Sequence, residues 1–378
     1  MSKVLIINSS PVSEGLLRLL RSLEQRGYYF YLMTTQKELL STIPKKKENK
    51  LERKIFLGPS LHCSRNVYLF IFLLPLLSFK QFLNLAYFKY KHGVREVICV
   101  NWNEKIVTCF VGRILRLRML WMELPTVDYE DKPTLLIRLF RSCSRQITFI
   151  VFLKADKFKL TELGISFDRI KMIPPAVNTE DHGAQDDIFS TLARSDHYSK
   201  NRNVFTIGVV DLEHSPQVET LFGAIKRSLD IIPELRVTVI GEREEQEYLR
   251  WLAQKMEIDK LVWLVGEQKD LAKWMKNFDL FIGLDEHPDV SELETTLKAM
   301  SVGVPVIALR NKGYEEIIEE NKSGTLVSMN DSEIMAQRII KLYQDDELRN
   351  YLSVTARKRI NSQYDRGKQL EEFERALE

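Results

Sequence analysis

The sequence predicts an α/β protein built from two Rossmann-like, doubly wound domains. Three observations lead to this fold class. The chain opens with a strand, a helix and a second strand, a polar stretch interrupts it at 179–203, and the alternation of strands and helices then begins again. Its 378 residues are enough for two domains of ordinary size.

The first half carries the elements of one parallel sheet. Residues 4–8 are almost entirely apolar, as expected for a strand that is covered on both faces. Residues 15–26 have leucines at helical spacing and end at Gly27, and 28–34 form the next strand. Later elements are expected at 96–100 (strand), 133–144 (helix), 146–153 (strand), 160–164 (the end of a helix) and 169–173 (strand).

The second half repeats the alternation after a linker. Strands are expected at 204–210, 235–240, 261–264, 280–284, 304–308 and 325–327, and helices at 218–229, 246–256, 271–276, 292–301, 314–320, 331–343 and 346–364. The domains are therefore assigned as 1–178, a linker at 179–203, 204–358, and a C-terminal helix at 359–378 that packs back toward the first domain. Ligands are expected in a central cleft at the carboxyl ends of the strands.

Composition excludes several classes of protein. Hydrophobic residues make up 44% and charged residues 28% of the chain, which argues against disorder, collagen and coiled coil. The net charge of +3 hides an asymmetry, since residues 1–180 have a balance of +14 and residues 181–378 one of −11. We therefore expect no nucleic-acid partner, and a first half that meets an anionic surface or substrate. A drift in charge between the two domains is the alternative.

The cysteines and the N-terminal residues bear on the compartment. Cys63, Cys99, Cys109 and Cys143 have no metal-like spacing and lie in apolar surroundings, as expected of buried thiols in a reducing compartment. The apolar start is too short for a signal peptide. The most apolar stretch, 67–79, is shorter than the ~20 residues that span a bilayer. A cytoplasmic location is expected, at the inner face of a membrane if the protein meets one.

A segment of the first half has the composition of a membrane-surface element. The basic run at 45–54 precedes an apolar stretch rich in Phe and Tyr, which is flanked by Arg65, Lys89 and Lys91. Each basic residue near anionic lipid contributes ~1 kcal/mol, so residues 45–91 predict a peripheral membrane contact. The alternative is a core helix under the strand at 96–100, preceded by a solvated basic loop.

Several segments of the second half resemble a known family. They are 173–179 (IPPAVNT), 205–242 with its PELRVTVIGE end, 299–308 (AMSVGVPVIA), 313–318 (GYEEII) and 323–327 (SGTLV). Their order and spacing are similar to those of GT-B glycosyltransferases of the retaining family called group 1 or family 4. The resemblance covers residues 165–365, and the first 160 residues only in topology.

The resemblance implies transfer of a sugar from a nucleotide-diphosphate sugar, with retained configuration and without a metal or other cofactor. The C-terminal domain would bind the donor, and the basic N-terminal domain a glycan or lipid-linked acceptor. Such a site must stabilise a departing diphosphate, for which basic side chains and the positive end of a helix are suited. The D-x-D triad that a metal-bridged diphosphate favours is absent from the sequence.

The donor-site acids depart from the family pattern. The family has a Glu directly before the Ala-Met pair and another eight residues earlier, where this chain has Lys298 and Val290. Glu286 and Glu294 have the same spacing four residues upstream, and Glu294 lies one helical turn before Lys298. We therefore place Glu286 among the catalytic candidates and Glu294 among the donor-binding ones. The alternative is that Glu292 and Glu294 are first-turn acids favoured by the helix dipole.

The family's diphosphate-binding Arg and Lys are also missing. His214 stands in the equivalent loop, and Arg243 and Lys298 are the nearest compensating cations, although each reads equally as a surface residue. Gly313 opens a helix whose backbone N–H groups would face a phosphate. Glu316 is in register with the family's Glu in the same turn.

The first domain offers candidates on the acceptor side. Ser9, Ser10 and Ser13 lie in the loop after the first strand, where Ser13 also reads as a helix N-cap. Glu123 and, in reserve, Asp128 follow a strand-like segment where the family has a His or an acid. The alternative for both acids is an ordinary loop position.

Two functions remain open on these residues. The first is a glycosyltransferase acting on a lipid-linked or polysaccharide acceptor. The second is a catalytically inactive GT-B relative that serves as a binding or scaffolding subunit. An epimerase of related architecture fits less well, because it would need the same phosphate contacts.

Overall fold

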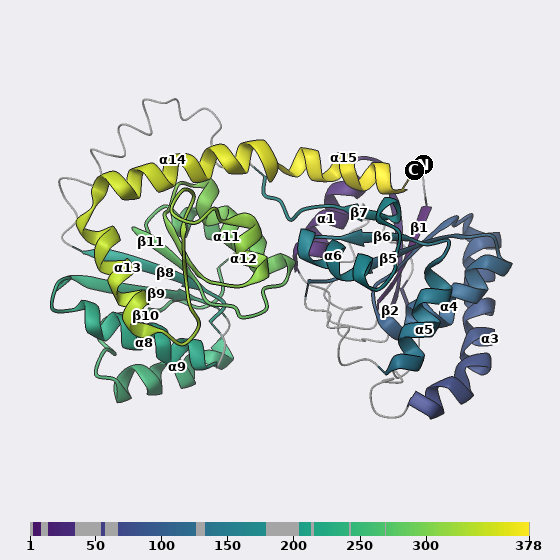
Figure 1. Cartoon of the computed structure of the whole chain (residues 1–378), viewed down its shortest axis with the longest axis horizontal. Coiled ribbons are helices and arrows are strands. Elements are labelled where there is room, and N and C mark those ends of the chain that lie inside the picture. Colours follow the sequence, from purple (N-terminus) through teal and green to yellow (C-terminus); the bar gives the residue numbers. More distant parts are fainter. Residues whose placement is uncertain are drawn as a thin grey trace. The chain divides into compact units, whose positions relative to one another are not determined.

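The protein divides into two compact units, each a parallel sheet with helices on its faces (Figure 1). A computed structural model describes residues 3–8, 14–34, 54–56, 67–125, 133–178, 204–212, 215–241, 243–268 and 270–377. Unit 1 comprises Met1–Pro174, Asp289–Ser291 and Leu370–Glu378, and unit 2 comprises Pro175–Pro288 and Glu292–Gln369. The linker predicted at 179–203 lies outside the described residues.

A seven-stranded sheet forms the middle of unit 1, in the order β3-β2-β1-β4-β5-β6-β7. The strands are β1 (Lys3–Asn8), β2 (Tyr29–Thr34), β3 (Lys54–Phe56), β4 (Glu96–Cys99), β5 (Arg118–Glu123), β6 (Thr148–Val151) and β7 (Ile170–Met172). All of these pairs are parallel, and Leu5 stands opposite Tyr31 on one side and Val97 on the other. This is the doubly wound arrangement that the sequence predicts.

Helices cover both faces of this sheet. They are α1 (Glu14–Gln25), α3 (Val67–His92), α4 (Trp102–Ile114), α5 (Thr134–Ser144) and α6 (Lys154–Glu162), with a short 3-10 turn at Phe167–Arg169 before β7. On one face, Phe88 of α3, Cys109 of α4 and Phe140 of α5 pack over Trp121 and Phe149 of the strands. On the opposite face the leucines of α1 pack over β1 and β2. The apolar strands are therefore covered on both sides.

The last turns of the chain belong to unit 1. Leu370, Phe373 and Leu377 share a core with the leucines of α1. The Arg118 guanidinium donates to the carbonyl oxygens of Ala376 (3.1 Å) and Leu377 at the end of this segment. These contacts fasten the C-terminal residues to β5.

Unit 2 contains a six-stranded parallel sheet in the order β10-β9-β8-β11-β12-β13. Its strands are β8 (Phe205–Val210), β9 (Leu235–Ile240), β10 (Val262–Leu264), β11 (Leu280–Gly283), β12 (Val306–Leu309) and β13 (Thr325–Val327). The helices of this half of the chain are α8 (Pro216–Ser228), α9 (Arg243–Lys255), α10 (Leu271–Met275), α11 (Val290–Ser301), α12 (Lys312–Ile317), α13 (Ser332–Gln344), α14 (Asp346–Gln363) and α15 (Arg366–Leu377). The first two residues of α11 and the part of α15 from Leu370 onward belong to unit 1. The six strands lie within two residues of the predicted ones.

Among the helices whose bounds differ from the expected ones, two have a local explanation. The helix expected at 314–320 occupies 312–317, because the Asn311 side chain accepts the N–H of Tyr314 and starts the helix two residues earlier. The C-terminal helix expected at 359–378 is interrupted at Tyr364 and Asp365. There Val177 accepts the N–H of Arg366 and donates its own N–H to Tyr364, so α15 is a separate helix.

The apolar segment of unit 1 is longer than its sequence suggests. Helix α3 runs from Val67 to His92 and continues through Pro75. Its part Tyr68–His92 is long and apolar enough, by length and composition, to cross a membrane. The estimate of a stretch too short to span a bilayer is therefore wrong, because the helix also includes the apolar residues after Ser78.

Three of the four cysteines lie in the described part of the chain. Cys99, Cys109 and Cys143 are free and buried, as predicted, and Cys63 lies outside the described residues. Burial raises the pKa of the Cys99 thiol to about 12, which keeps it protonated and unreactive.

Candidate functional site

The carboxyl edge of the sheet in unit 2 gathers the polar residues that follow its strands. Asp285 and Glu286 follow β11, and Asn311 lies two residues after the end of β12. Gln217 lies in the first turn of α8, which follows β8. Because the strands are parallel, all of these loops meet at one edge. Ligands of doubly wound sheets bind at this edge.

Asp285 links two of these loops. The hydroxyl of Tyr314 donates to its Oδ2 at 2.9 Å, and the side-chain amide of Asn311 donates to its backbone oxygen at 2.9 Å. Asn311 also accepts the backbone N–H of Tyr314 at 3.0 Å. The loop after β11 is thereby fixed to the start of α12.

Tyr314 is fully buried behind this edge, and Gly283 makes room for it. A Cβ at Gly283 would stand 2.8 Å from the Tyr314 hydroxyl, too close for any side chain. Burial raises the pKa of Tyr314 well above its usual value, and the negative charge of Asp285 raises it further. The hydroxyl therefore stays protonated and acts as a donor at neutral pH.

Glu286 is the predicted catalytic acid that the structure places at this edge. It is half-buried and accepts a hydrogen bond from the Gln217 amide nitrogen. Its neighbour His287 is exposed. Glu286 thus combines a fixed orientation with access to solvent.

The loop after β12 also carries positive charge. Arg310 is exposed and forms ion pairs with Glu315 (3.5 Å) and Glu320 (2.6 Å). Lys312, the first residue of α12, is exposed and has no ion pair among the described residues. A cation at this position is suited to an anionic ligand group.

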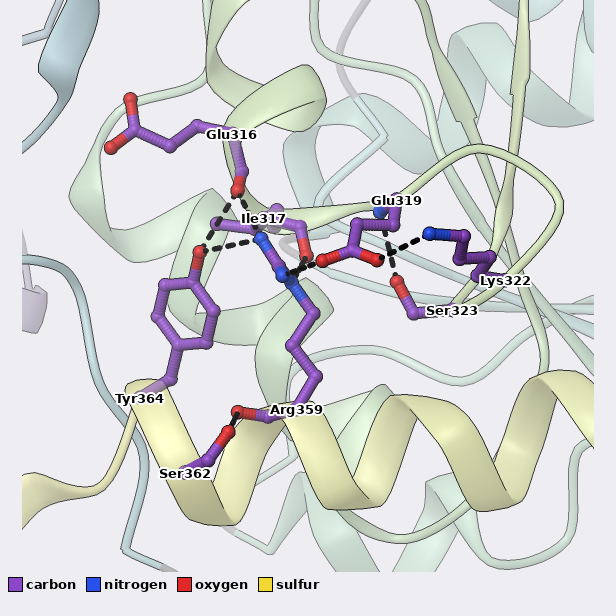
Figure 2. A network of polar contacts seen from close by, with 8 residues as sticks. All are labelled: Glu316, Ile317, Glu319, Lys322, Ser323, Arg359, Ser362 and Tyr364. Carbon is purple, nitrogen blue, oxygen red and sulfur yellow. Dashed lines mark hydrogen bonds and ion pairs between the residues drawn. The ribbon is translucent and has the colours of Figure 1, made fainter.

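Helix α12 is anchored from behind by α14, as Figure 2 shows. The Arg359 guanidinium donates to the backbone oxygens of Glu316 and Ile317, each at 2.9 Å, and the Tyr364 hydroxyl also donates to the Glu316 oxygen at 2.9 Å. Arg359 forms an ion pair with Glu319. The other carboxylate oxygen of Glu319 lies 3.6 Å from the Lys322 ammonium. These bonds satisfy carbonyls at the C-terminal end of α12 and connect this end to α14.

Two predicted donor-binding residues lie in α12. Gly313 is buried, and a Cβ there would stand 2.7 Å from Pro288. The backbone N–H of its neighbour Tyr314 donates to the Asn311 side chain. The prediction that the N–H groups at this helix start face a phosphate is therefore wrong for Tyr314. The Glu316 carboxylate points away from Arg359 and Glu319 (Figure 2).

Glu294, the predicted ribose ligand, is held elsewhere. It lies in the second turn of α11, is 2% exposed and forms an ion pair with Arg366 at 2.9 Å. The alternative is that Glu292 and Glu294 are both acids of the first helical turn. It holds for Glu292 alone, because α11 begins at Val290 and Glu294 lies in its second turn. Glu286 and Glu294 therefore bond to different partners.

The predicted cation Lys298 lies on the same helix as Glu294. It lies in the last turn of α11, about 12 Å along the helix axis from its start at the strand ends. Lys312, the first residue of α12, follows β12 at the carboxyl edge.

Other predicted residues lie outside the described part of the chain. They are His214, Asp128, Ser9, Ser10 and Ser13. Arg243 opens α9 directly after the turn that follows β9, and its side chain is not described. These six positions remain predictions.

Glu123, the remaining catalytic candidate, ends β5 in the interior of unit 1. Its carboxylate lies 2.8 Å from the Lys105 ammonium of α4, and the two side chains are 1% and 0% exposed. The pair is a buried salt bridge, so Glu123 has no access to solvent in this conformation. Sequence reasoning did not find Lys105, because its helix was not predicted.

The network residues Asp285, Asn311, Tyr314 and Gln217 were also missed. The signal that they share is position, since each lies within a few residues of a strand end or in the helix that follows it. Among the described residues, no three His, Cys, Asp or Glu side chains are grouped so as to hold a metal ion.

Sequence comparison matches the segment that contains this site to a family model. Residues 191–359 match the model of the family described as glycosyl transferases group 1. N-acetyl-alpha-D-glucosaminyl L-malate synthase of Bacillus anthracis is 25% identical over 40% of this chain and 42% of its own length. The lipopolysaccharide core biosynthesis glycosyltransferase LpsE of Rhizobium meliloti is 24% identical over 39% of this chain and 42% of its own. The chain thus matches less than half the length of these curated relatives.

Structural comparison covers the whole chain. A glycosyltransferase from Rickettsia africae matches with a TM-score of 0.75 and 15% identity over 100% of this chain and 99% of its own. Anabaena HepE in complex with UDP matches with a TM-score of 0.71, also at 15% identity, over 100% and 99%.

The two sheets are those of the GT-B fold of glycosyltransferases. Residues 191–359, which make up most of unit 2, match the group 1 glycosyl transferases.

Proposed function

We propose that this protein transfers a sugar from a nucleotide-diphosphate sugar to a glycan or lipid-linked acceptor, with retained configuration and without a metal. The observation that carries the proposal is the coincidence of the family segment with the network at the carboxyl edge of unit 2. Structures of Anabaena HepE with UDP and with UDP-glucose support a nucleotide-sugar donor.

The residues at the edge suit the two ends of such a donor. Glu286, half-buried and oriented by Gln217, would accept hydroxyl groups of the sugar or ribose. Lys312 would offset the charge that develops on the departing diphosphate. Asp285 and Tyr314 would hold the loop of Glu286 in place without touching the donor.

A donor panel tests this assignment. UDP, GDP, ADP and their sugars are titrated into the full chain by calorimetry, with hydrolysis and transfer measured for any nucleotide that binds. Lys312→Ala should weaken binding of both the nucleotide and its sugar about tenfold, because a charge-assisted bond is lost. Glu286→Gln should lower turnover more than it lowers nucleotide affinity.

Matched controls lie at the opposite edge of the same sheet. Glu234 and Lys260 are exposed and precede β9 and β10, so Glu234→Gln and Lys260→Ala make the same chemical changes away from the site. Both controls should bind and turn over the donor as the parent does. Failure of every nucleotide to bind the parent would overturn the proposed donor site.

For the acceptor, we propose presentation at the cytoplasmic face of an anionic membrane. Helix α3 packs on α4 through one side and exposes a continuous apolar stripe on the other. The exposed residues are Tyr68, Leu69, Phe72, Leu76, Phe79, Leu83, Tyr87 and Tyr90. Their spacing of three and four residues places them on one face of the helix.

The topology favours a helix that lies on the membrane over one that crosses it. Helix α3 is the connection between β3 and β4, two parallel strands of the same sheet, so both of its ends return to unit 1. Phe88 is in the core of the unit. Lys89 and Lys91 lie over the rings of Tyr90 and Tyr87, where cations would meet lipid phosphates.

Vesicle sedimentation tests the membrane contact. The parent should sediment with phosphatidylglycerol-containing vesicles and less with phosphatidylcholine alone. Phe72→Ser with Phe79→Ser should abolish most of this binding, since both rings are exposed. Trp251→Ser with Tyr351→Ser removes two exposed aromatic rings from unit 2 and should leave it unchanged. Equal sedimentation of the two double variants would contradict the proposal.

A binding or scaffolding subunit without catalysis is the second candidate. It is favoured by the ion pairs that occupy Glu123 and Glu294, two of the acids expected to act on ligands. Nucleotide-sugar binding at the Lys312 site without hydrolysis or transfer to any acceptor would select this function.

A further inference from the structure

An arginine-lined cavity opens at the amino edge of the sheet in unit 1, where α5 ends and β7 begins. Its volume is about 520 Å³, and its lining includes Arg138, Arg141, Arg145 and Arg169. Ser142, Ser144 and Ser166 supply hydroxyl groups, and no acidic side chain lines it. We call it the arginine pocket.

Arginines at the end of a helix commonly bind its free carbonyl groups, but here other residues do so. Arg113 of α4 donates to the backbone oxygens of Ser142 (3.4 Å) and Cys143 (3.3 Å). Arg169 donates to the oxygen of Ser144 at 3.4 Å. The last carbonyls of α5 are therefore occupied without its own arginines.

Arg138, Arg141 and Arg145 are left without such a role. All three are exposed, and within the described residues they make no side-chain hydrogen bond or ion pair. Their spacing of three and four residues puts like charges on one helix face, which is unfavourable in isolation. The helix dipole favours only the last turn and so does not account for Arg138.

We propose that the arginine pocket binds a phosphate-bearing ligand. Guanidinium groups match phosphate oxygens with paired N–H donors, and the hydroxyls of Ser142 and Ser166 provide further donors, whereas the Ser144 hydroxyl donates to the backbone oxygen of Arg141. A doubly charged phosphate group relieves the repulsion among three arginines more fully than a carboxylate does. This site lies at the amino edge of unit 1's sheet and needs none of the residues assigned to the sugar donor.

Titration with inorganic tripolyphosphate tests the pocket. Arg141→Ala with Arg145→Ala should raise its dissociation constant by about tenfold or more in the full chain, because two charge-assisted contacts are lost. Arg21→Ala with Arg250→Ala makes the same change in net charge at exposed arginines elsewhere and should have little effect. Arg141→Lys with Arg145→Lys keeps the charge but loses the paired donors, so binding should be intermediate.

A second arm separates the two sources of the phosphate. The same variants are sedimented with phosphatidylglycerol vesicles. If the Arg141 and Arg145 alanine variant loses tripolyphosphate binding but still sediments with vesicles, the pocket binds a soluble phosphate. If the variant loses vesicle binding, the pocket binds a lipid headgroup. The proposal is overturned when neither probe distinguishes the parent from this variant, with thermal unfolding confirming that both are folded.

Discussion

Four arginines of unit 2 form ion pairs with carboxylates, whereas no acidic side chain lines the arginine pocket of unit 1, and helix α3 of unit 1 exposes aromatic rings. In unit 2, Arg310, Arg349, Arg359 and Arg366 all form ion pairs. In unit 1, the arginine pocket contains no acidic side chain. Both units are doubly wound parallel sheets, so the fold itself does not require the difference.

The contrast indicates which surfaces meet partners. Unpaired cations and a continuous apolar stripe are unfavourable in water unless something covers or binds them. Unit 2 has scattered exposed apolar residues, as monomeric proteins usually do. This contrast supports the proposals that unit 1 contacts anionic surfaces and that the edge network of unit 2 recognises the nucleotide.

The buried ion pair of unit 1 gives the largest expected effect. Lys105→Met leaves Glu123 as an unpaired buried charge and should lower the free energy of unfolding by about 3–5 kcal/mol. Urea denaturation measures this loss. Adding Glu123→Leu removes the stranded charge and should restore most of the stability. If the double variant is no more stable than the single one, the pair is not a matched buried salt bridge.

The network of unit 2 should respond more weakly. Tyr314→Phe removes the donor to Asp285 in a buried site and should lower the free energy of unfolding by about 1–3 kcal/mol. Tyr343→Phe is the control, because that ring is 36% exposed and its hydroxyl makes no described hydrogen bond. Equal effects of the two changes would mean that the Tyr314 bond does not hold the loop.

The exposed stripe should matter little for stability. Phe72→Ser and Phe79→Ser should each change the free energy of unfolding by less than about 0.5 kcal/mol, because both rings lie in solvent. Phe88→Ala, on the buried side of the same helix, should cost about 3–5 kcal/mol. Thermal and urea unfolding of the three variants would show whether the stripe is a surface, as its exposure indicates, or part of the core.

The smallest effect concerns Glu96 at the start of β4. Burial raises the pKa of this carboxyl, an effect that Arg118 partly offsets. The folded state therefore favours the protonated form, so this contribution to stability is present below the unfolded pKa and is lost as pH rises through the folded pKa. Glu96→Gln should gain stability relative to the parent between about pH 4 and pH 7. Exposed Glu162→Gln should show no such change.

Much of the fold follows from local patterns of residues. Strands such as β9 and β13 were predicted at their observed bounds, because apolar runs flanked by turn residues are specific to buried parallel strands. Helix α4 was missed because buried residues, including Lys105 and Thr108, interrupt its apolar face. Burial of a lysine depends on a partner in β5, which no local window contains.

The candidate site could be predicted only in part. Glu286 was found through its spacing to Glu294, and it does lie at the strand ends. Glu294 forms its ion pair with Arg366, which is 72 residues away in the sequence. Asp285 accepts its hydrogen bond from Tyr314, which is 29 residues away. Such pairings depend on tertiary packing, so residue type and spacing alone do not reveal which acids are occupied.

The passage of α15 into unit 1 affects how the chain is made. Phe373 and its neighbours complete a core whose other members, apart from Val290, precede residue 175, yet they leave the ribosome after all of unit 2. At the usual rate of synthesis, the intervening residues take roughly 10–40 s to emerge. For that time the apolar surface of α1 and β1 that Phe373 will cover stays open to chaperones. The core of unit 1 therefore becomes complete only after unit 2 has been synthesised, although the strands of unit 1 are made first.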